Sequence, residues 1–224
     1  MSVPLRLIVF DVDGTLVDSQ GDIVASMAAA FDGVGLPMPE RTRVLSIVGL
    51  SLDVAIPRLV PGQSAAIYAQ MVEGYKSAYM SLRARQGTQQ SSPLYPGIRA
   101  VLEELHAVPE FLLGVATGKS RRGLDALLSG HQMTGVFLTQ QVADHHPSKP
   151  HPSMLQTALA EAGVEPENAV MIGDTEFDMT MARAAGMRSI GVTWGYHGAD
   201  RLDAADKLVH SVPDLPGAIQ ELWR

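Results

Sequence analysis

The stretch Leu7-Ile8-Val9-Phe10-Asp11-Val12-Asp13-Gly14-Thr15-Leu16 decides the fold. Its opening apolar run predicts a buried strand, and two carboxylates follow at once. Residues two apart in an extended chain point the same way, so Asp11 and Asp13 are expected to share one small volume. Two ionised carboxylates so close repel each other and need a cation or a shared proton. This pattern predicts a site at the carboxyl end of a parallel sheet.

The Asp-x-Asp-Gly motif also has simpler explanations. A calcium-binding loop requires glycine at its sixth position, which is Leu16 here, so that explanation fails. An ordinary surface turn after a strand remains open for the isolated motif. The remaining chain must therefore decide between a turn and a site.

Composition restricts the class of protein. The 224 residues are 46% hydrophobic and 18% charged, with a net charge of −7. The acidic balance argues against a nucleic-acid binder, which is usually basic. The absence of cysteine excludes disulfides, thiolate metal sites and a cysteine nucleophile. Residues 1–6 form a poor secretory signal, and no apolar run approaches the roughly 20 residues of a membrane span. We expect a soluble, cytoplasmic protein without a membrane or nucleic-acid partner.

The first part of the chain after the opening strand, at 5–10, is predicted to be helical. Asp18 and Ser19 are expected to cap a helix that runs to about Phe31. Further helical segments are expected near 40–47, 51–60 and 63–85. The polar tract 86–93 has the composition of a linker. Residues 18–92 are therefore predicted to be a helical domain inserted into a core domain of residues 1–17 and 93–224.

After the linker, helices and strands alternate. Helices are expected at 97–107, 120–130, 153–163, 176–185 and 214–223, and strands at 111–116, 136–139, 169–172, 189–192 and 207–210. Such alternation predicts an α/β fold, a Rossmann-like doubly wound parallel sheet with right-handed crossovers.

Other polar clusters follow the predicted strands. Thr117-Gly118-Lys119-Ser120 combines a hydroxyl, a glycine amide and a helix start, which is an anion-binding arrangement; plain capping by Ser120 is the alternative. Lys149 lies among three prolines that restrict the backbone, although an exposed loop lysine is also possible. The spacing of His145, His146 and His151 does not support a metal site.

Asp174 follows the predicted strand 169–172, and Asp178 lies one helical turn later. Early-helix acids are favoured by the helix dipole, but that does not explain Asp174 at the strand end. Together, these clusters fit metal-assisted phosphoryl transfer with a carboxylate nucleophile. Thr117 and Lys149 would hold the phosphoryl oxygens, and Asp13 would act as general acid and base.

With these residues assembled, the chain resembles the haloacid dehalogenase superfamily, and within it the phosphoglycolate-phosphatase-like group. Asp11-Val12-Asp13-Gly14-Thr15 is similar to the first motif, Thr117 to the second, Lys149 to the third and the segment 173–178 to the fourth. The helical insertion matches the position of the family's cap domain, so the resemblance covers the whole chain.

The resemblance implies a role for each motif residue. Asp11 would be the nucleophile and Asp13 the general acid/base. Mg²⁺ would be held by the side chains of Asp11 and Asp174 and the backbone carbonyl of Asp13. Asp178 would support the metal site by orienting Lys149 or a metal-bound water.

The substrate-binding residues are expected to come from both domains. Thr117, Gly118 and Lys149 belong to the core, and Gly49 and Arg58 are the cap candidates. A solvated helix face is the alternative for Arg58. The segment Trp194-Gly195-Tyr196-His197-Gly198 lies after a strand end and is a candidate for lining the pocket; for Trp194, packing in the core is the alternative.

The sequence predicts a Mg²⁺-dependent phosphatase for a small phosphorylated metabolite such as 2-phosphoglycolate, as monomer or homodimer. A phosphomutase resembling β-phosphoglucomutase would use the same nucleophile. A non-enzymatic phospho-signalling module resembling receiver domains is disfavoured, because such domains are shorter and have no cap. A dehalogenase is disfavoured because its first motif lacks the second aspartate, which is Asp13 here.

Overall fold

A parallel sheet forms the centre of the protein, which we describe from a computed structural model covering residues 4–223. Its strands have the spatial order β3-β2-β1-β4-β5-β6, and every neighbouring pair is parallel. The strands are β1 (Arg6–Phe10), β2 (Phe111–Thr117), β3 (Thr139–Val142), β4 (Ala169–Gly173), β5 (Arg188–Val192) and β6 (Lys207–Val209). The predicted doubly wound α/β fold is confirmed.

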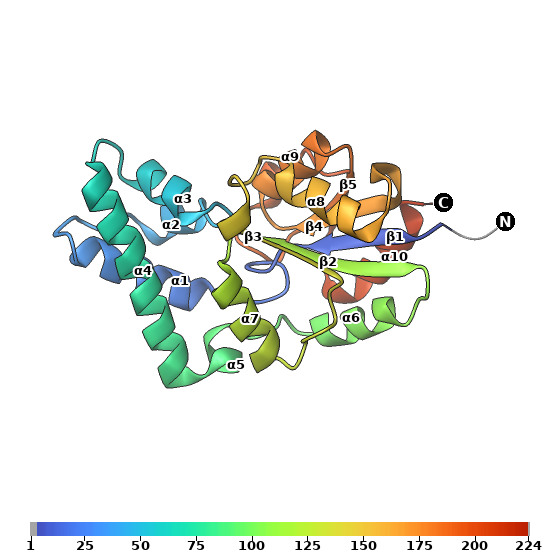
Figure 1. Cartoon of the computed structure of the whole chain (residues 1–224), viewed down its shortest axis with the longest axis horizontal. Helices are drawn as coiled ribbons and strands as arrows, with labels where there is room; N and C mark the ends of the chain where they lie inside the picture. Colours follow the sequence, from blue (N-terminus) through green and yellow to red (C-terminus); the bar gives the residue numbers. More distant parts are fainter. Residues whose placement is uncertain (1–3, 224) are drawn as a thin grey trace.

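Helices cover both faces of this sheet (Figure 1). One face packs against α6 (Ile98–His106), α7 (Arg121–Gly130) and α10 (Leu215–Glu221), and the other against α8 (Ser153–Ala162) and α9 (Glu176–Ala184). Alternate residues of β1 point to opposite faces of the sheet. Ile8 and Phe10 pack in the core on the face of α6, α7 and α10, and Leu7 and Val9 pack in the core on the face of α8 and α9. Because both faces of β1 are covered, its residues form a continuous apolar run. Short 3₁₀ helices lie at Ala143–His145, Pro166–Asn168, Ala199–Arg201 and Val212–Asp214.

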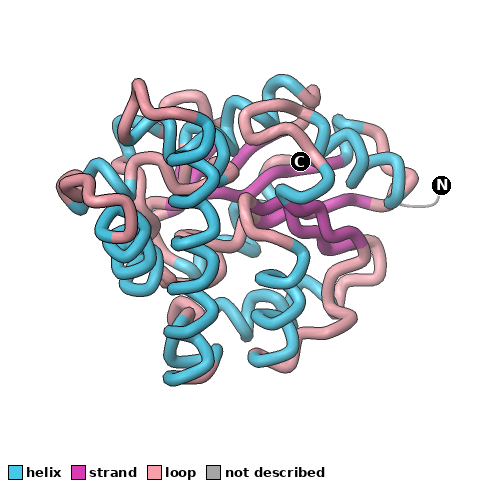
Figure 2. Tube along the Cα trace, turned by 60° about the vertical axis from the view of Figure 1, so that its left-hand side comes forward, coloured by secondary structure: helices cyan, strands magenta, loops and turns pink. Residues whose placement is uncertain are grey.

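A separate group of helices lies at the carboxyl end of the sheet, on the left in Figure 1 and in front of the strands in Figure 2. It comprises α1 (Gln20–Asp32), α2 (Arg41–Leu45), α3 (Leu52–Leu59), α4 (Ala65–Gln86) and α5 (Thr88–Ser91). We call this group the helical part. It has its own apolar core, which includes Met27, Phe31, Ile56 and Met71. The segment that leads from the sheet into the helical part lies beside the segment that returns from it, and Val17 pairs antiparallel with Leu94 there.

Two segments differ from expectation near the helical part. The tract 86–93 contains α5, and Ser91 and Ser92 are buried within it. It is a packed connection because Ser91 donates to Asp22 and the Ser92 carbonyl bonds to His131. Ser19 occupies the N-cap position of α1 without a capping bond from its side chain, because its hydroxyl donates to Asp13 instead.

The predicted strand 136–139 is misplaced, since β3 occupies Thr139–Val142. The apolar residue Phe137, which precedes the strand, packs into the core. The strand itself carries mainly polar side chains. Thr139 and Gln141 are buried in this strand, and their polar groups are satisfied because both donate to Glu161, at 2.6 Å and 2.8 Å. A strand whose buried face is polar lacks the apolar alternation by which strands are recognised.

Within residues 4–223, no helix is long and apolar enough to cross a membrane. The predicted absence of a secretory signal concerns residues 1–6, of which residues 1–3 lie outside the described part of the chain.

Candidate active site

The predicted site residues converge because their strands are neighbours. Asp11 follows β1, Thr117 ends β2 and Asp174 follows β4, and the sheet order places β1 between the other two. Parallel strands present their carboxyl ends along one edge, so these side chains share a single site.

A buried ion-pair cluster forms the floor of this site. The Lys149 ammonium lies 2.8 Å from Asp11 Oδ1 and 2.7 Å from Asp178 Oδ1, and all three residues are at most 1% exposed. The other Asp178 oxygen accepts bonds from the amide and hydroxyl of Thr175, at 3.1 Å and 2.7 Å. Asp178 is thus fully engaged in holding Lys149 and the start of α9.

Burial sets the protonation preferences of this cluster. It raises the pKa of Asp11 to about 7, a shift that Lys149 opposes and Asp178 adds to. Burial alone would lower the pKa of Lys149, but the carboxylates of Asp11 and Asp178 outweigh it and raise that pKa. Lys149 is therefore a fixed positive charge beside Asp11.

Asp174 is held by two donors. The Thr15 hydroxyl donates to Oδ1 at 2.9 Å and the Tyr196 amide donates to Oδ2 at 2.8 Å. Burial, followed by the charges of Asp11 and Asp178, raises its pKa well above the usual value. Gly14 and Gly195 leave space for this carboxylate, since a Cβ at either position would overlap it.

The donor set fits a divalent cation. Among the described residues, Asp11, Asp174 and Asp178 each offer an oxygen within 4.8 Å of the others. Asp11 Oδ2 is buried without a hydrogen-bond partner in this structure. A buried carboxylate oxygen without a partner is unfavourable, and carboxylate oxygens are the ligands that Mg²⁺ and Ca²⁺ prefer.

Asp13 lies beside this cluster and has different partners. Its Oδ1 accepts from the Ser19 hydroxyl and lies 2.8 Å from Lys119 Nζ. Lys119 also donates to the Tyr79 hydroxyl of α4 at 3.2 Å and lies over the Tyr79 ring. Asp13 is thus oriented by Ser19, at the N-cap of α1, and by Lys119, just before α7.

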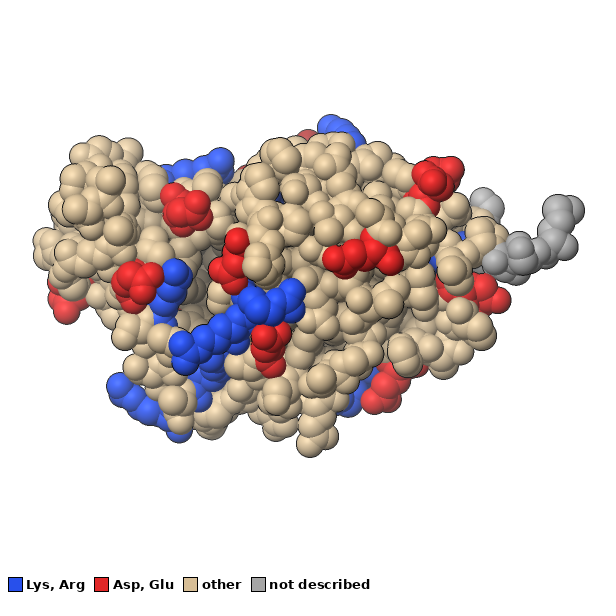
Figure 3. All heavy atoms as spheres, in the orientation of Figure 1, with Lys and Arg blue, Asp and Glu red and all other residues tan. Residues whose placement is uncertain are grey.

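A cavity of about 420 Å³ opens above Asp11 and Asp13, between the sheet and the helical part. Lys and Arg side chains gather beside the same junction in Figure 3. Gly49 and Gly118 both line the cavity, and a Cβ at Gly118 would lie 2.8 Å from the Gly49 carbonyl oxygen. This close approach of two loops requires glycine at 118.

Among the candidates for the substrate site, Arg58, Thr117 and Trp194 do not line this cavity. Arg58 is exposed, does not line the cavity and lies 5.8 Å from the Phe177 ring. Thr117 is fully buried, and its hydroxyl accepts from the Lys119 amide at 3.2 Å. Trp194 packs against the core and donates to the Thr15 carbonyl.

The structure also brings residues to the site that sequence reasoning missed. Lys119 contacts Asp13, the Tyr196 amide contacts Asp174, and Tyr79 contacts Lys119. Lys119 had a signal as part of the Thr-Gly-Lys-Ser stretch, and Tyr196 belongs to the segment 194–198, which follows a strand end; Tyr79 had none. Of the loop histidines, His146 is bonded through both ring nitrogens, to Gln141 and Ser153, which agrees with a role in ordering its loop.

Comparisons with known proteins agree with this geometry. Residues 8–192 match the family model described as haloacid dehalogenase-like hydrolase. The protein named "Probable phosphatase IndB" from Dickeya dadantii (strain 3937) is 33% identical over 223 residues, covering 97% of this chain and 95% of that protein. A phosphoglycolate phosphatase of Vibrio parahaemolyticus is 31% identical over 206 residues, covering 90% of both chains.

Solved structures share the fold. A predicted phosphoglycolate phosphatase from Haemophilus somnus 129pt has a TM-score of 0.84 at 24% identity and covers 97% of this chain and 99% of that one. A β-phosphoglucomutase from Clostridium difficile has a TM-score of 0.83 at 21% identity, covering 98% of this chain and 97% of that one.

Proposed function

Since the chain belongs to the haloacid dehalogenase-like hydrolase family, we propose that it is a Mg²⁺-dependent phosphatase acting through an aspartyl phosphate on Asp11. One observation carries the proposal. Asp11 lines the cavity with one oxygen paired to Lys149 and the other without a hydrogen-bond partner. A buried carboxylate that faces a cavity beside a lysine ammonium can attack a bound phosphate with one oxygen while its other oxygen binds a cation.

The first step transfers the phosphoryl group to the enzyme. An Asp11 carboxylate oxygen forms a bond to phosphorus, and the bond between phosphorus and the substrate's alcohol oxygen breaks. Asp13 gives its proton to the departing alkoxide. Lys149 and the amide of Gly118 hold the phosphoryl oxygens, with Thr117 shaping the loop that carries this amide.

The second step returns the enzyme to its starting state. Asp13, now a carboxylate, takes a proton from a water molecule whose oxygen attacks phosphorus. The bond from Asp11 to phosphorus breaks, and inorganic phosphate leaves. The contacts of Asp13 with Ser19 and Lys119 support this role, because they hold its carboxylate beside Asp11.

Mg²⁺ would be held by the side chains of Asp11 and Asp174 and by the backbone carbonyl of Asp13. When bound, it would neutralise charge shared between the carboxylates and the phosphate. Thr15 and the Tyr196 amide would orient Asp174, and Asp178 would act through Lys149.

Residues 18–92 would form the cap domain and residues 1–17 and 93–224 the core. The position of the cavity between the two supports this division. Small phosphorylated metabolites are the proposed substrates, in the cytoplasm. The names of several relatives make 2-phosphoglycolate the first compound to try.

Phosphate release from a panel of phosphorylated metabolites, with Mg²⁺ or with EDTA, tests this proposal. We expect Mg²⁺-dependent release that Asp11→Asn abolishes while its circular dichroism spectrum stays native. Isomerisation of sugar phosphates without release would indicate instead a phosphomutase, whose fold this chain shares. A stable phosphoenzyme without turnover would indicate a phospho-signalling role.

A further inference from the structure

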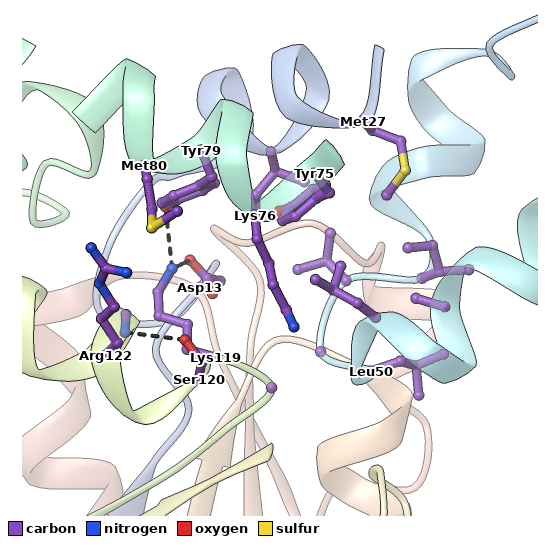
Figure 4. A pocket seen from close by; sticks show the side chains of 18 of the residues that line it. Asp13, Met27, Leu50, Tyr75, Lys76, Tyr79, Met80, Lys119, Ser120 and Arg122 are labelled. Carbon is purple, nitrogen blue, oxygen red and sulfur yellow. Dashed lines mark hydrogen bonds and ion pairs between the residues drawn. The ribbon is translucent and has the colours of Figure 1, made fainter. Parts of the chain in front are cut away.

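The cavity has two chemically different sides. Its floor is polar and comes from the core, with Asp11, Asp13 and Lys119 among its residues. The opposite side, which we call the roof, comes from the helical part and is mainly apolar. The roof includes Ile23, Met27, Leu50, Leu52, Tyr75 and Tyr79. Figure 4 labels Met27, Leu50, Tyr75 and Tyr79.

Two tyrosines give the roof a fixed aromatic surface. The rings of Tyr75 and Tyr79 stack with their centroids 6.0 Å apart and their planes at 26°. The Tyr79 hydroxyl is bonded to both Lys119 and Ser92, so its ring is held in place. Met27 extends from α1 beside Tyr75 (Figure 4), and a thioether adapts well to a flat ring.

Three charged side chains of α4, Glu73, Lys76 and Arg83, also line the cavity from the cap side. Lys76 extends from α4 into the cavity (Figure 4), but its ammonium is already paired with Glu73 at 3.0 Å. A substrate with its phosphate on the floor would extend its other end toward a roof in which apolar side chains predominate. Taking a carboxylate out of water without full pairing is unfavourable.

We propose that the preferred substrate is a phosphate monoester whose alcohol carries a flat apolar body of about the size of an aromatic ring, packed against Leu52 and Tyr75. The inference rests on the phosphatase proposal and replaces its first substrate candidate. A cavity of about 420 Å³ falls within the usual range of ligand pockets, about 300–1,000 Å³, and a two-carbon acid would leave much of it unfilled.

Benzyl phosphate, ethyl phosphate and 2-phosphoglycolate test the preference. All three release an aliphatic alcohol, so the difficulty of breaking the ester bond is similar. We expect kcat/KM with Mg²⁺ to be higher for benzyl phosphate by about tenfold or more. An equal or higher kcat/KM for either small substrate would overturn the inference and leave the phosphatase proposal intact.

Substitutions of roof residues test whether the roof causes the preference for an aromatic substrate. Leu52 and Tyr75 are half-buried, so Leu52→Asn and Tyr75→Ala are suitable substitutions. Each is expected to lower the ratio of kcat/KM for benzyl phosphate to that for ethyl phosphate by about tenfold. Leu138→Asn is the control, because Leu138 is 58% exposed and does not line the cavity. An unchanged ratio in both folded roof variants would contradict the assignment.

Calorimetric titration with benzylphosphonate and ethylphosphonate separates binding from turnover. We expect benzylphosphonate to bind more tightly in the presence of Mg²⁺. Tighter binding without phosphate release from any ester would support the roof's role and overturn the phosphatase proposal. Equal binding of the two phosphonates would overturn the inference.

Discussion

A single lysine pairs with two buried carboxylates at the floor of the site. Lys149 pairs with both Asp11 and Asp178, and none of the three is more than 1% exposed. Removing one member of such a group leaves charge buried without compensation. The floor is therefore expected to be sensitive to changes of single residues.

Lys149→Met is expected to lower the free energy of unfolding by about 3–5 kcal/mol, because it leaves both carboxylates buried without a counter-charge. Urea denaturation without Mg²⁺ measures the loss. Lys207→Met is the control: Lys207 pairs with Glu221 at the surface, where a salt bridge contributes about 0–1 kcal/mol. Equal losses for the two variants would contradict the account of the floor.

Gly195→Ala tests the space around Asp174. A Cβ at Gly195 would overlap the Asp174 side chain, so the carboxylate must move. We expect Mg²⁺ affinity, measured by calorimetric titration, to fall by about tenfold or more. Gly217→Ala, where a Cβ meets nothing within 4 Å, should leave it unchanged. Normal affinity in Gly195→Ala would argue against Asp174 as a ligand.

At the scale of elements, the loop after β5 is tied to the helical part through His197. Its Nδ1 accepts from the Glu176 amide at 3.3 Å, and its Nε2 bonds to the Ser46 carbonyl at 3.1 Å. The Arg201 guanidinium also donates to the Ser46 carbonyl. This arrangement requires a neutral imidazole with its proton on Nε2.

The stability of this connection is expected to depend on pH. Burial, and then the charge of Arg201, lowers the pKa of His197, while Glu176 opposes the shift. The folded state therefore binds fewer protons than the unfolded state, and this contribution to stability is lost as the pH falls below about 6.5. Urea denaturation should show a larger loss from about pH 7.5 to about pH 5 in the wild type than in His197→Gln. Identical losses would contradict this.

The sequence allowed most elements to be predicted, and the exceptions share a physical cause. Strands buried on both faces and helices with an apolar stripe produce patterns that local reading detects. The β3 strand was predicted too early in the chain because its buried residues Thr139 and Gln141 are polar and bond to Glu161, which lies far along the chain. The hydroxyl of Ser19 similarly bonds to Asp13 rather than capping α1.

The site was predictable to the same extent. Asp11, Lys149 and Asp174 lie close together because each follows a strand at the carboxyl edge of one sheet, and Thr117 ends the neighbouring strand β2. The cavity roof was not predictable, since its residues are also ordinary members of an apolar helix core. Whether an apolar side chain faces a core or a cavity depends on tertiary packing.

At the scale of the whole molecule, metal binding should stabilise the fold. The carboxylates of Asp11 and Asp174 repel each other and are buried, so a cation that binds only the folded state raises its stability. At a Mg²⁺ concentration of about 100 times the Kd, the gain is about 2.7 kcal/mol. Thermal denaturation with Mg²⁺ or EDTA should show a higher Tm with the metal. Asp174→Asn should lose that difference, and a full shift in this variant would contradict the proposed ligand set.

The measurement that tests the central claim most directly is the chemical identification of residue 11 during turnover. The wild-type enzyme is mixed with Mg²⁺ and a substrate it hydrolyses, quenched in acid within milliseconds and reduced with borohydride, which converts an aspartyl phosphate to homoserine. Peptide mass spectrometry is predicted to find homoserine in place of Asp11 and at no other aspartate. Homoserine at Asp13 or Asp174, or at no position while phosphate is being released, would contradict the assignment of Asp11 as the nucleophile.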